Sequence, residues 1–239
     1  MKLEQSERSV TASPKIEDDC YDWYERHALK CRETASRVFD LVFIGDSLTH
    51  FWAGESGCDY GSAVWTQYYG RRRVQNLGFG FDRTQNVLWR LEHGELDGQT
   101  PKLIVLNIGT NQFSGTPRYP RDTPEAAAAG IRAVSEKIRS MFPGTFLILT
   151  ALFPRGTAGS ELARLTGETN RLVKSFAVSE KSLFLDLGAQ TGFPDHSARP
   201  EFFQPDLTHL NERGYRVWAE ALEPHIRRIL DDGPEVSTP

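Results

Sequence analysis

Residue types that together can activate a hydroxyl group occur at two distant places in the chain. Ser47 follows Gly45 and Asp46 directly after the apolar residues of the stretch LVFIGDSLTH. Asp206 and His209 lie three positions apart in the stretch QPDLTHLNERGY. A serine hydroxyl is a poor nucleophile near neutral pH unless an adjacent base removes its proton. A histidine oriented by a carboxylate can be that base, so these residues point to nucleophilic catalysis.

Both stretches also have a structural interpretation. Gly, Asp and Ser are the usual residues where a strand turns into a loop. An Asp just before a helix is often only its cap, beside a surface histidine. The three-residue spacing, however, lets the Asp206 carboxylate reach Nδ1 of His209 within a turn and leaves Nε2 directed outward. We therefore predict Ser47, Asp206 and His209 as a catalytic group.

Two further stretches contain donors for a developing oxyanion. In NLGFGFDRT, Gly78 and Gly80 leave their backbone N–H groups unscreened by side chains. In NIGTNQFSG, Asn111 follows a glycine, a pattern that by itself is most often a turn. Each donor aimed at the oxyanion of a tetrahedral intermediate typically contributes about 2.7–4 kcal/mol. We predict that the N–H groups of Ser47 and Gly78 and the side-chain amide of Asn111 form this oxyanion hole.

Short apolar runs alternate with helical patterns along most of the chain. Runs such as KLIVLNIG and TFLILTAL are apolar on both faces, as are parallel strands covered by helices. One predicted helix begins after Thr123 as N-cap with Pro124 in its first turn, and another has Asp82 as its N-cap. The predicted strands are residues 40–45, 73–78, 102–109, 145–152 and 182–188.

The alternation predicts an α/β protein, a three-layer α/β/α sandwich around a five-stranded parallel sheet. Ligands of such folds bind outside the carboxyl ends of the strands, where Ser47 and Asn111 are expected. We predict one domain over residues 16–231, a disordered segment over 1–15 and a flexible tail over 232–239.

Composition narrows the class of protein. The 239 residues carry a formal net charge of -4, whereas nucleic-acid-binding proteins usually have a basic surplus, so no nucleic-acid partner is expected. The longest apolar stretch, 146–153, is too short to span a membrane, and the N-terminus lacks the apolar core of a signal peptide. Cys20, Cys31 and Cys58 are odd in number, which favours reduced thiols over a disulfide scaffold. We expect a cytoplasmic protein, although a signal removed beforehand would leave no trace.

The four polar stretches resemble, in the same order, the sequence blocks of the SGNH (GDSL) hydrolase superfamily. The resemblance covers about residues 38–230, and it is closest to the catalytic subunits of intracellular platelet-activating-factor acetylhydrolase. The runs TQNVLWRLEHGELDGQTPKLIVLNIGTN and LFPRG also match that subgroup. The matching positions are Gly45-Asp46-Ser47-Leu48 for the nucleophile, Gly78 and Asn111 for the oxyanion hole, and Asp206 with His209 for the D-x-x-H block.

This resemblance implies a flavodoxin-like three-layer fold, no metal or other cofactor, a small-molecule ester substrate and pairing into a homodimer. The chain departs from the subgroup at Phe81, where the relatives have a second glycine, and at Gln112, where they have asparagine. Phe81 adds bulk at this position, so the acyl preference of the relatives cannot be transferred to this chain.

Other side chains near these blocks are candidates for binding a substrate or a metal ion. We predict that Leu48, Trp52 and Phe81 line the substrate pocket, and we interpret most other aromatic residues as core. Asp195 and His196, taken with the D-x-x-H residues, suggest a metal site, but their mixed spacing is poor for zinc. We therefore expect no metal.

The sequence thus predicts a serine ester hydrolase that forms a covalent acyl-enzyme. The resemblance favours small acyl groups, acetyl above all, on a sugar, a lipid or a small alcohol. Three alternatives stay open: an acyltransferase on the same scaffold, a longer-chain lipase or thioesterase, and a binding module without turnover.

Overall fold

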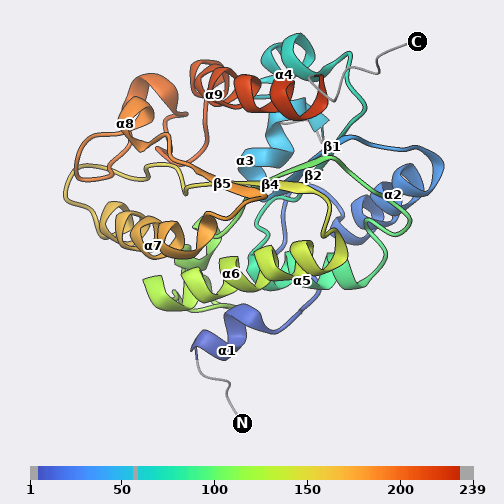
Figure 1. The fold of residues 1–239 in the computed structure, drawn as a ribbon. Coiled ribbons are helices and arrows are strands. Elements are labelled where there is room, and N and C mark those ends of the chain that lie inside the picture. Colours follow the sequence, from blue (N-terminus) through green and yellow to red (C-terminus); the bar gives the residue numbers. More distant parts are fainter. Residues whose placement is uncertain (1–4, 56–58, 232–239) are drawn as a thin grey trace.

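A single parallel sheet organises the computed structural model, which describes residues 5–55 and 59–231. Its strands lie in the order β2-β1-β3-β4-β5, and helices cover both faces (Figure 1). The predicted three-layer α/β/α class is confirmed. The strands are β1 (Leu41–Gly45), β2 (Val74–Gly78), β3 (Leu103–Asn107), β4 (Phe146–Thr150) and β5 (Ser182–Leu185).

The helices divide into two layers, with α2 (Trp23–Ser36) lying against β2. One layer holds α1 (Gln5–Val10), α5 (Thr84–Glu92), α6 (Pro124–Met141) and α7 (Glu161–Ala177) (Figure 1). The other holds α3 (Ser47–His50), α4 (Ser62–Tyr69), α8 (Gly188–Thr191) and α9 (Glu212–Leu230). The short 3-10 helices include η1 (Phe51–Ala53), which directly follows α3, η3 (Thr110–Phe113) and η4 (Pro200–Phe202).

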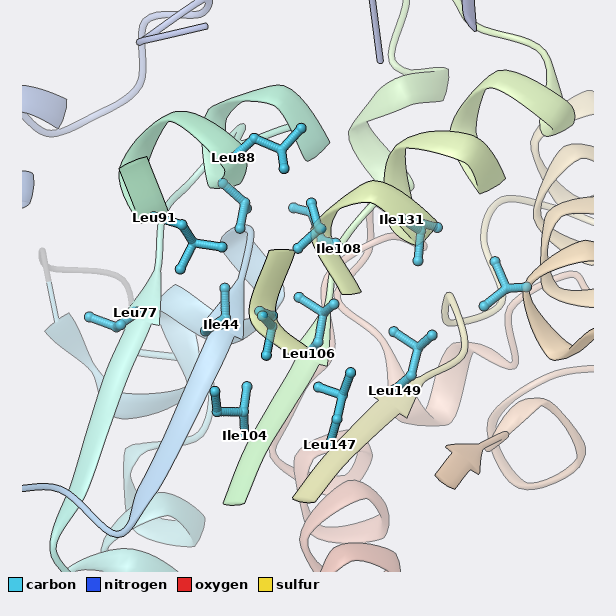
Figure 2. Packing of buried hydrophobic residues seen from close by; sticks show 14 of the residues in the cluster. Ile44, Leu77, Leu88, Leu91, Ile104, Leu106, Ile108, Ile131, Leu147 and Leu149 are labelled. Carbon is cyan, nitrogen blue, oxygen red and sulfur yellow. The ribbon is translucent and has the colours of Figure 1, made fainter. Parts of the chain in front are cut away.

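Two hydrophobic cores fill the space between the sheet and its two helix layers. Successive side chains of a strand point to opposite faces, so Ile104 and Leu106 enter one core while Leu103 and Val105 enter the other. Figure 2 shows the first core, where Leu88 and Leu91 of α5 and Ile131 of α6 meet the strands. This double burial explains why the strand sequences are apolar throughout.

The second core is built on stacked aromatic rings. Trp52 is fully buried, and its ring stacks on Trp218 of α9 with the centroids 4.6 Å apart. The ring of Tyr215, also on α9, stacks on the Trp52 ring with the centroids 5.1 Å apart. These contacts hold the segment after α3 against the C-terminal helix α9. They thereby bring segments that are distant in the sequence close together.

Of the two N-caps predicted from the sequence, the one of α6 is confirmed and the one of α5 is wrong. Thr123 accepts the N–H of Ala126 at 3.2 Å and Pro124 opens α6, as predicted. For α5, however, the N-cap is Arg83 and not Asp82. The carboxylate of Asp82 is turned to Trp23 and Arg90 instead, from which it accepts hydrogen bonds at 2.7 Å and 2.8 Å.

Residues 5–15, predicted to be disordered, pack against the body of the protein instead. Ser9 of α1 donates to Asp122 at 2.8 Å, and its carbonyl accepts from Thr84 at 2.7 Å. The segment approaches α6 closely, since a Cβ on Gly130 would lie 2.8 Å from the Ser9 carbonyl oxygen. The sequence prediction failed because polar contacts to distant residues, and not apolar burial, hold this segment. Residues 1–4 and the predicted tail 232–239 lie outside the described residues.

Two further observations bear on earlier expectations. Cys31 carries a free thiol, and Cys58 lies outside the described residues. Within the described ranges, none of the helices has the length and apolar character that a membrane crossing requires.

The stacked core makes Trp52→Ala strongly destabilising. Removing a large buried aromatic side chain leaves a cavity, and we expect the free energy of unfolding to fall by about 3–5 kcal/mol in urea titrations. Tyr24→Ala is the matched control, because Tyr24 is an exposed aromatic residue on α2 and should cost less than about 1 kcal/mol. A comparable loss in both variants would contradict the assignment of Trp52 to the core.

Candidate active site

Ser47 lies just after the carboxyl end of β1 and is the first residue of α3. Asp46 caps this short helix by accepting the N–H of Leu48 at 3.0 Å. The turn is tight, because a Cβ on Gly45 would lie 2.2 Å from Oγ1 of Thr49 and 2.5 Å from the carbonyl oxygen of Asn107. Glycine is therefore required just before the Asp-Ser pair, and the turn presents Ser47 at the sheet edge.

A row of hydrogen bonds joins Ser47 to the loop before α9. Nε2 of His209 lies 2.8 Å from Oγ of Ser47, and Nδ1 of His209 lies 2.6 Å from Oδ2 of Asp206. The other carboxylate oxygen of Asp206 accepts the backbone N–H groups of Thr208 and His209 at 2.9 and 3.0 Å. The structure thus brings the three predicted residues together. The Asp206 carboxylate also stabilises the turn that leads to His209.

Electrostatics favour an ionised Asp206. Burial alone would raise the pKa of this carboxyl, but hydrogen bonds from His209 and Thr208 outweigh it and hold the pKa below its ordinary value. An ionised carboxylate at Nδ1 holds the proton there and leaves Nε2 as the acceptor facing the serine hydroxyl. The arrangement can therefore withdraw the Ser47 proton and stabilise the imidazolium that forms.

Asn111 enters the same site from η3, which follows β3. Its side-chain Nδ2 donates one hydrogen to the carbonyl oxygen of Asp82 at 3.0 Å, and its Oδ1 accepts from Ser114 at 3.2 Å. A primary amide has two N–H hydrogens, so the second stays available to the cavity. The structure places Asn111 where the sequence analysis expected it.

Gly78 does not face the cavity, so its prediction as an oxyanion donor is wrong. Its N–H donates to Oδ1 of Asn76 at 2.8 Å. A Cβ on Gly78 would lie 2.1 Å from the backbone nitrogen of His50, so glycine is needed here for the close packing of α3 on β2. Gly78 therefore serves close packing, and its N–H is already bonded to Asn76.

Phe81 occupies the place predicted for Gly78. It lines the cavity beside Ser47 and Asn111, and its φ of 59° is left-handed, a conformation that disfavours bulky residues. The N–H groups of Phe79, Gly80 and Asp82 are all bonded within the protein. Phe81 alone in this loop keeps an N–H without a hydrogen-bond partner among the described residues.

The cavity has a volume of about 260 Å³ and combines residues from six parts of the chain. Of the predicted lining residues, only Phe81 is present. Leu48 and Trp52 are buried in the second core, so their prediction as lining residues is wrong. Tertiary packing turned them inward although they lie close to Ser47 in sequence. The lining residues are Asp19, Ser47, Phe51, Phe81, Asn111, Ser114, Arg155, Asp206, Thr208 and His209.

Arg155 is a site residue that sequence reasoning did not assign. Its guanidinium donates to the carbonyl oxygen of Thr110 at 2.8 Å and to Oγ1 of Thr208 at 3.3 Å. Arg155 therefore ties the Asn111 loop to the His209 loop. The run LFPRG, which contains it, was the available signal. Gln112, the departure next to Asn111, is buried away from the cavity and donates to Asp122 at 2.7 Å.

Asp195, one of the residues that suggested a metal site, stabilises a loop instead. Asp195 accepts hydrogen bonds from Ser197 at 2.6 Å and from the N–H of Gly159 at 3.0 Å. In residues 5–55 and 59–231, no three His, Cys, Asp or Glu side chains are grouped so that they could hold a metal ion.

A serine, a histidine and a carboxylate in one hydrogen-bonded row, at the carboxyl edge of a parallel α/β sheet, form the arrangement of a serine hydrolase. Comparison with known proteins identifies the family within this class. The model of the GDSL-like lipase/acylhydrolase family matches residues 43–217. The chain belongs to this family and is a carboxylic ester hydrolase.

Individual relatives agree with this assignment. The chain is 30% identical over 221 residues to subunit alpha1 of platelet-activating factor acetylhydrolase IB from Rattus norvegicus, a match that covers 91% of this chain and 88% of the relative. Among solved structures, a GDSL-like lipase from Bacteroides thetaiotaomicron has a TM-score of 0.68 at 17% identity, covering 87% of this chain and 98% of the other. An acetylxylan esterase from Geobacillus stearothermophilus has a TM-score of 0.59 at 20% identity, covering 80% and 93%. At these identities, the two structures show the shared fold alone.

The buried carboxyl of Asp46 should make the free energy of unfolding depend on pH. Burial raises its pKa from 3.8 to about 7, so between these values the folded state binds more protons than the unfolded state. The contribution of Asp46 is therefore fully present below its unfolded pKa and is lost as the pH rises toward its folded pKa. We expect Asp46→Asn to lose less unfolding free energy than the wild type between about pH 4 and about pH 7. Urea titrations across this range measure the difference, and an equal or steeper loss in the variant would sink the prediction.

Proposed function

We propose that the protein is a serine esterase that cleaves small acyl esters, acetyl above all, through a covalent acyl-enzyme. The observation that carries the proposal is the 2.8 Å approach of His209 Nε2 to Ser47 Oγ, at the wall of a cavity that Asn111 also lines. The alcohol part of the substrate is a sugar, a lipid or a small alcohol.

In the acylation step, Oγ of Ser47 attacks the ester carbonyl carbon while Nε2 of His209 takes the hydroxyl proton. The carbonyl π electrons move to the oxygen, which becomes an oxyanion in the tetrahedral intermediate. Asp206 stabilises the imidazolium without taking its proton. When the intermediate collapses, the bond to the alkoxy oxygen breaks, and His209 gives its proton to the leaving alcohol.

Deacylation repeats these roles with water. His209 takes a proton from a water molecule as the water oxygen attacks the acyl carbon, and a second oxyanion forms. Collapse breaks the bond to Oγ of Ser47, which receives the proton from His209. The products are a carboxylic acid and the restored serine.

Three donors are available for the oxyanion: the N–H groups of Ser47 and Phe81 and the second amide hydrogen of Asn111. Their residues border the same cavity. Phe81 takes the donor role first predicted for Gly78 in this proposal. The choice is supported by the N–H of Gly78, which is already bonded, and by the N–H of Phe81, which is not. Because the donors are fixed by the fold, they need not reorganise when the charge develops.

Small acyl groups fit this site best. A cavity of about 260 Å³ lies below the usual range of about 300–1,000 Å³ for pockets that take drug-sized ligands. The Phe81 ring further limits its opening. The names of the relatives, an acetylhydrolase and an acetylxylan esterase, describe acetyl removal in those proteins and support the same choice here.

Replacing Ser47 by Ala should abolish ester hydrolysis and leave the fold intact, because the nucleophile is lost without a change in packing. We expect wild-type turnover of p-nitrophenyl esters to fall steeply beyond butyryl in an acetyl-to-decanoyl series, and the variant to keep less than a few per cent. A serine-directed phosphonate should label the wild type only.

Other outcomes of this series separate the alternatives. Rising rates toward long chains would favour a lipase or thioesterase, and product formation that needs an added acceptor would favour an acyltransferase. Absence of both turnover and labelling would favour a binding module. The homodimer and the cytoplasmic location stay predictions.

Phe81→Gly should widen the acyl preference. Glycine adopts the left-handed conformation at no steric cost and keeps the N–H, while loss of the ring opens the cavity. We expect the ratio of kcat/KM for hexanoyl over acetyl esters to rise roughly tenfold. Phe193→Gly is the matched control, since Phe193 is an exposed phenylalanine that does not line the cavity. An unchanged ratio in Phe81→Gly would remove Phe81 as a determinant of acyl size.

A further inference from the structure

Residues 13–22, here called the N-terminal strap, lie outside the family match at 43–217 yet reach the active-site cavity. Asp19 of the strap lines the cavity. Both ends of the strap are anchored: Nδ2 of Asn86 donates to the carbonyl oxygen of Pro14 at 2.8 Å, and Asp22 caps α2. The strap also contacts Gly80 directly, since a Cβ there would lie 1.8 Å from Oδ2 of Asp19.

Tyr21 of the strap binds the peptide that carries the Phe81 N–H. Its hydroxyl donates to the carbonyl oxygen of Gly80 at 3.1 Å. That carbonyl and the N–H of Phe81 belong to one peptide group, which is trans and planar, so they point in opposite directions. Holding the Gly80 oxygen on the Tyr21 side therefore directs the Phe81 N–H to the other side, where the cavity lies.

The same loop is held from a second direction by His50. The N–H of Gly80 donates to Nδ1 of His50 at 3.2 Å, and the Tyr21 ring meets the His50 ring edge-on at 4.7 Å. Burial lowers the pKa of His50 to about 2, so its ring stays neutral and can accept this bond. Burial likewise raises the pKa of Tyr21, which keeps its hydroxyl as a donor.

The loop needs such support because its conformation is unfavourable by itself. A left-handed backbone at a residue with a Cβ costs roughly 1–2 kcal/mol. Phe81 adopts it with φ 59°. Without the bond from Tyr21, rotation of the Gly80–Phe81 peptide would relieve this strain and turn the N–H out of the cavity.

The strap also supports the Asn111 donor. Glu17 forms an ion pair with Arg83 at 3.1 Å, and both side chains are almost fully buried. The Arg83 guanidinium donates in turn to the backbone carbonyl of Asn111. Two of the three oxyanion donors are thus connected to the strap, each through one intermediate group.

We propose that Tyr21 and Glu17 are positioning residues of the oxyanion hole, which makes the N-terminal strap part of the catalytic apparatus. This inference rests on the proposed function. It assigns the strap a role in stabilising the transition state, distinct from substrate binding.

Tyr21→Phe tests the inference, because it removes the hydroxyl and keeps the ring. We expect kcat for p-nitrophenyl acetate to fall roughly 10- to 100-fold while KM changes less than about twofold, as for an interaction made mainly in the transition state. Affinity for a trifluoromethyl ketone, whose adduct carries an oxyanion, should fall in parallel. Tyr24→Phe is the matched control and should leave all three values unchanged.

A second variant keeps the test independent of Tyr21. Glu17→Gln removes the charge that holds Arg83, and we expect a roughly three- to tenfold loss of kcat with KM again unchanged. Unfolding midpoints of both variants show whether the fold is retained.

The outcomes separate the inference from the function on which it rests. Wild-type turnover that depends on Ser47, with kcat of Tyr21→Phe within about twofold of wild type, would overturn the inference alone. A rise in KM at constant kcat would do the same, since it would assign Tyr21 to substrate binding. Absence of Ser47-dependent turnover in the wild type would overturn the proposed function and the inference together.

Discussion

The hydrogen bond between His209 and Ser47 is the contact on which the site depends, and it joins residues 162 positions apart. Neither residue is placed by its neighbours alone. Ser47 is held by the end of a central strand, and His209 by a loop whose position depends on α9. The stacking of Trp52 on Trp218 fastens these two parts together from inside the second core. The chemistry at the sheet edge therefore rests on apolar packing beneath it.

Arg155 and Asp82 extend this dependence to the other loops. Arg155 spans from Thr110 to Thr208 and so links the loops that carry Asn111 and His209. Asp82 offers its carbonyl to the Asn111 amide while its carboxylate is held by Trp23 and Arg90. Buried charged groups of this kind are costly unless every partner is in place, and they favour one arrangement of the loops over others.

Unfavourable features gather near the oxyanion donors. Burial raises the pKa of both Asp46 and Asp82 to about 7, and Phe81, which lines the cavity, adopts a left-handed backbone. Such features persist only where the surrounding structure enforces them. The N-terminal strap, fastened by polar contacts, supplies part of that enforcement. This gives a physical reason for an ordered segment that contributes little to either hydrophobic core.

Local chemistry and strand order were enough for the sequence to determine the class of fold and four site residues, Ser47, Asn111, Asp206 and His209. Each is tied to a short pattern whose geometry is set within a few residues, and parallel strands bring their carboxyl ends to one edge. The direction of a single N–H or side chain could not be predicted in this way. Gly78 and Phe81 differ in role because Gly78 packs against His50 of α3, whereas Tyr21 holds the Gly80 carbonyl next to Phe81. Trp52 points into the core because α9 covers it, and residues 5–15 are ordered because Asp122 and Thr84 meet Ser9. Only the tertiary structure decided these points, since each depends on a partner far away in the sequence.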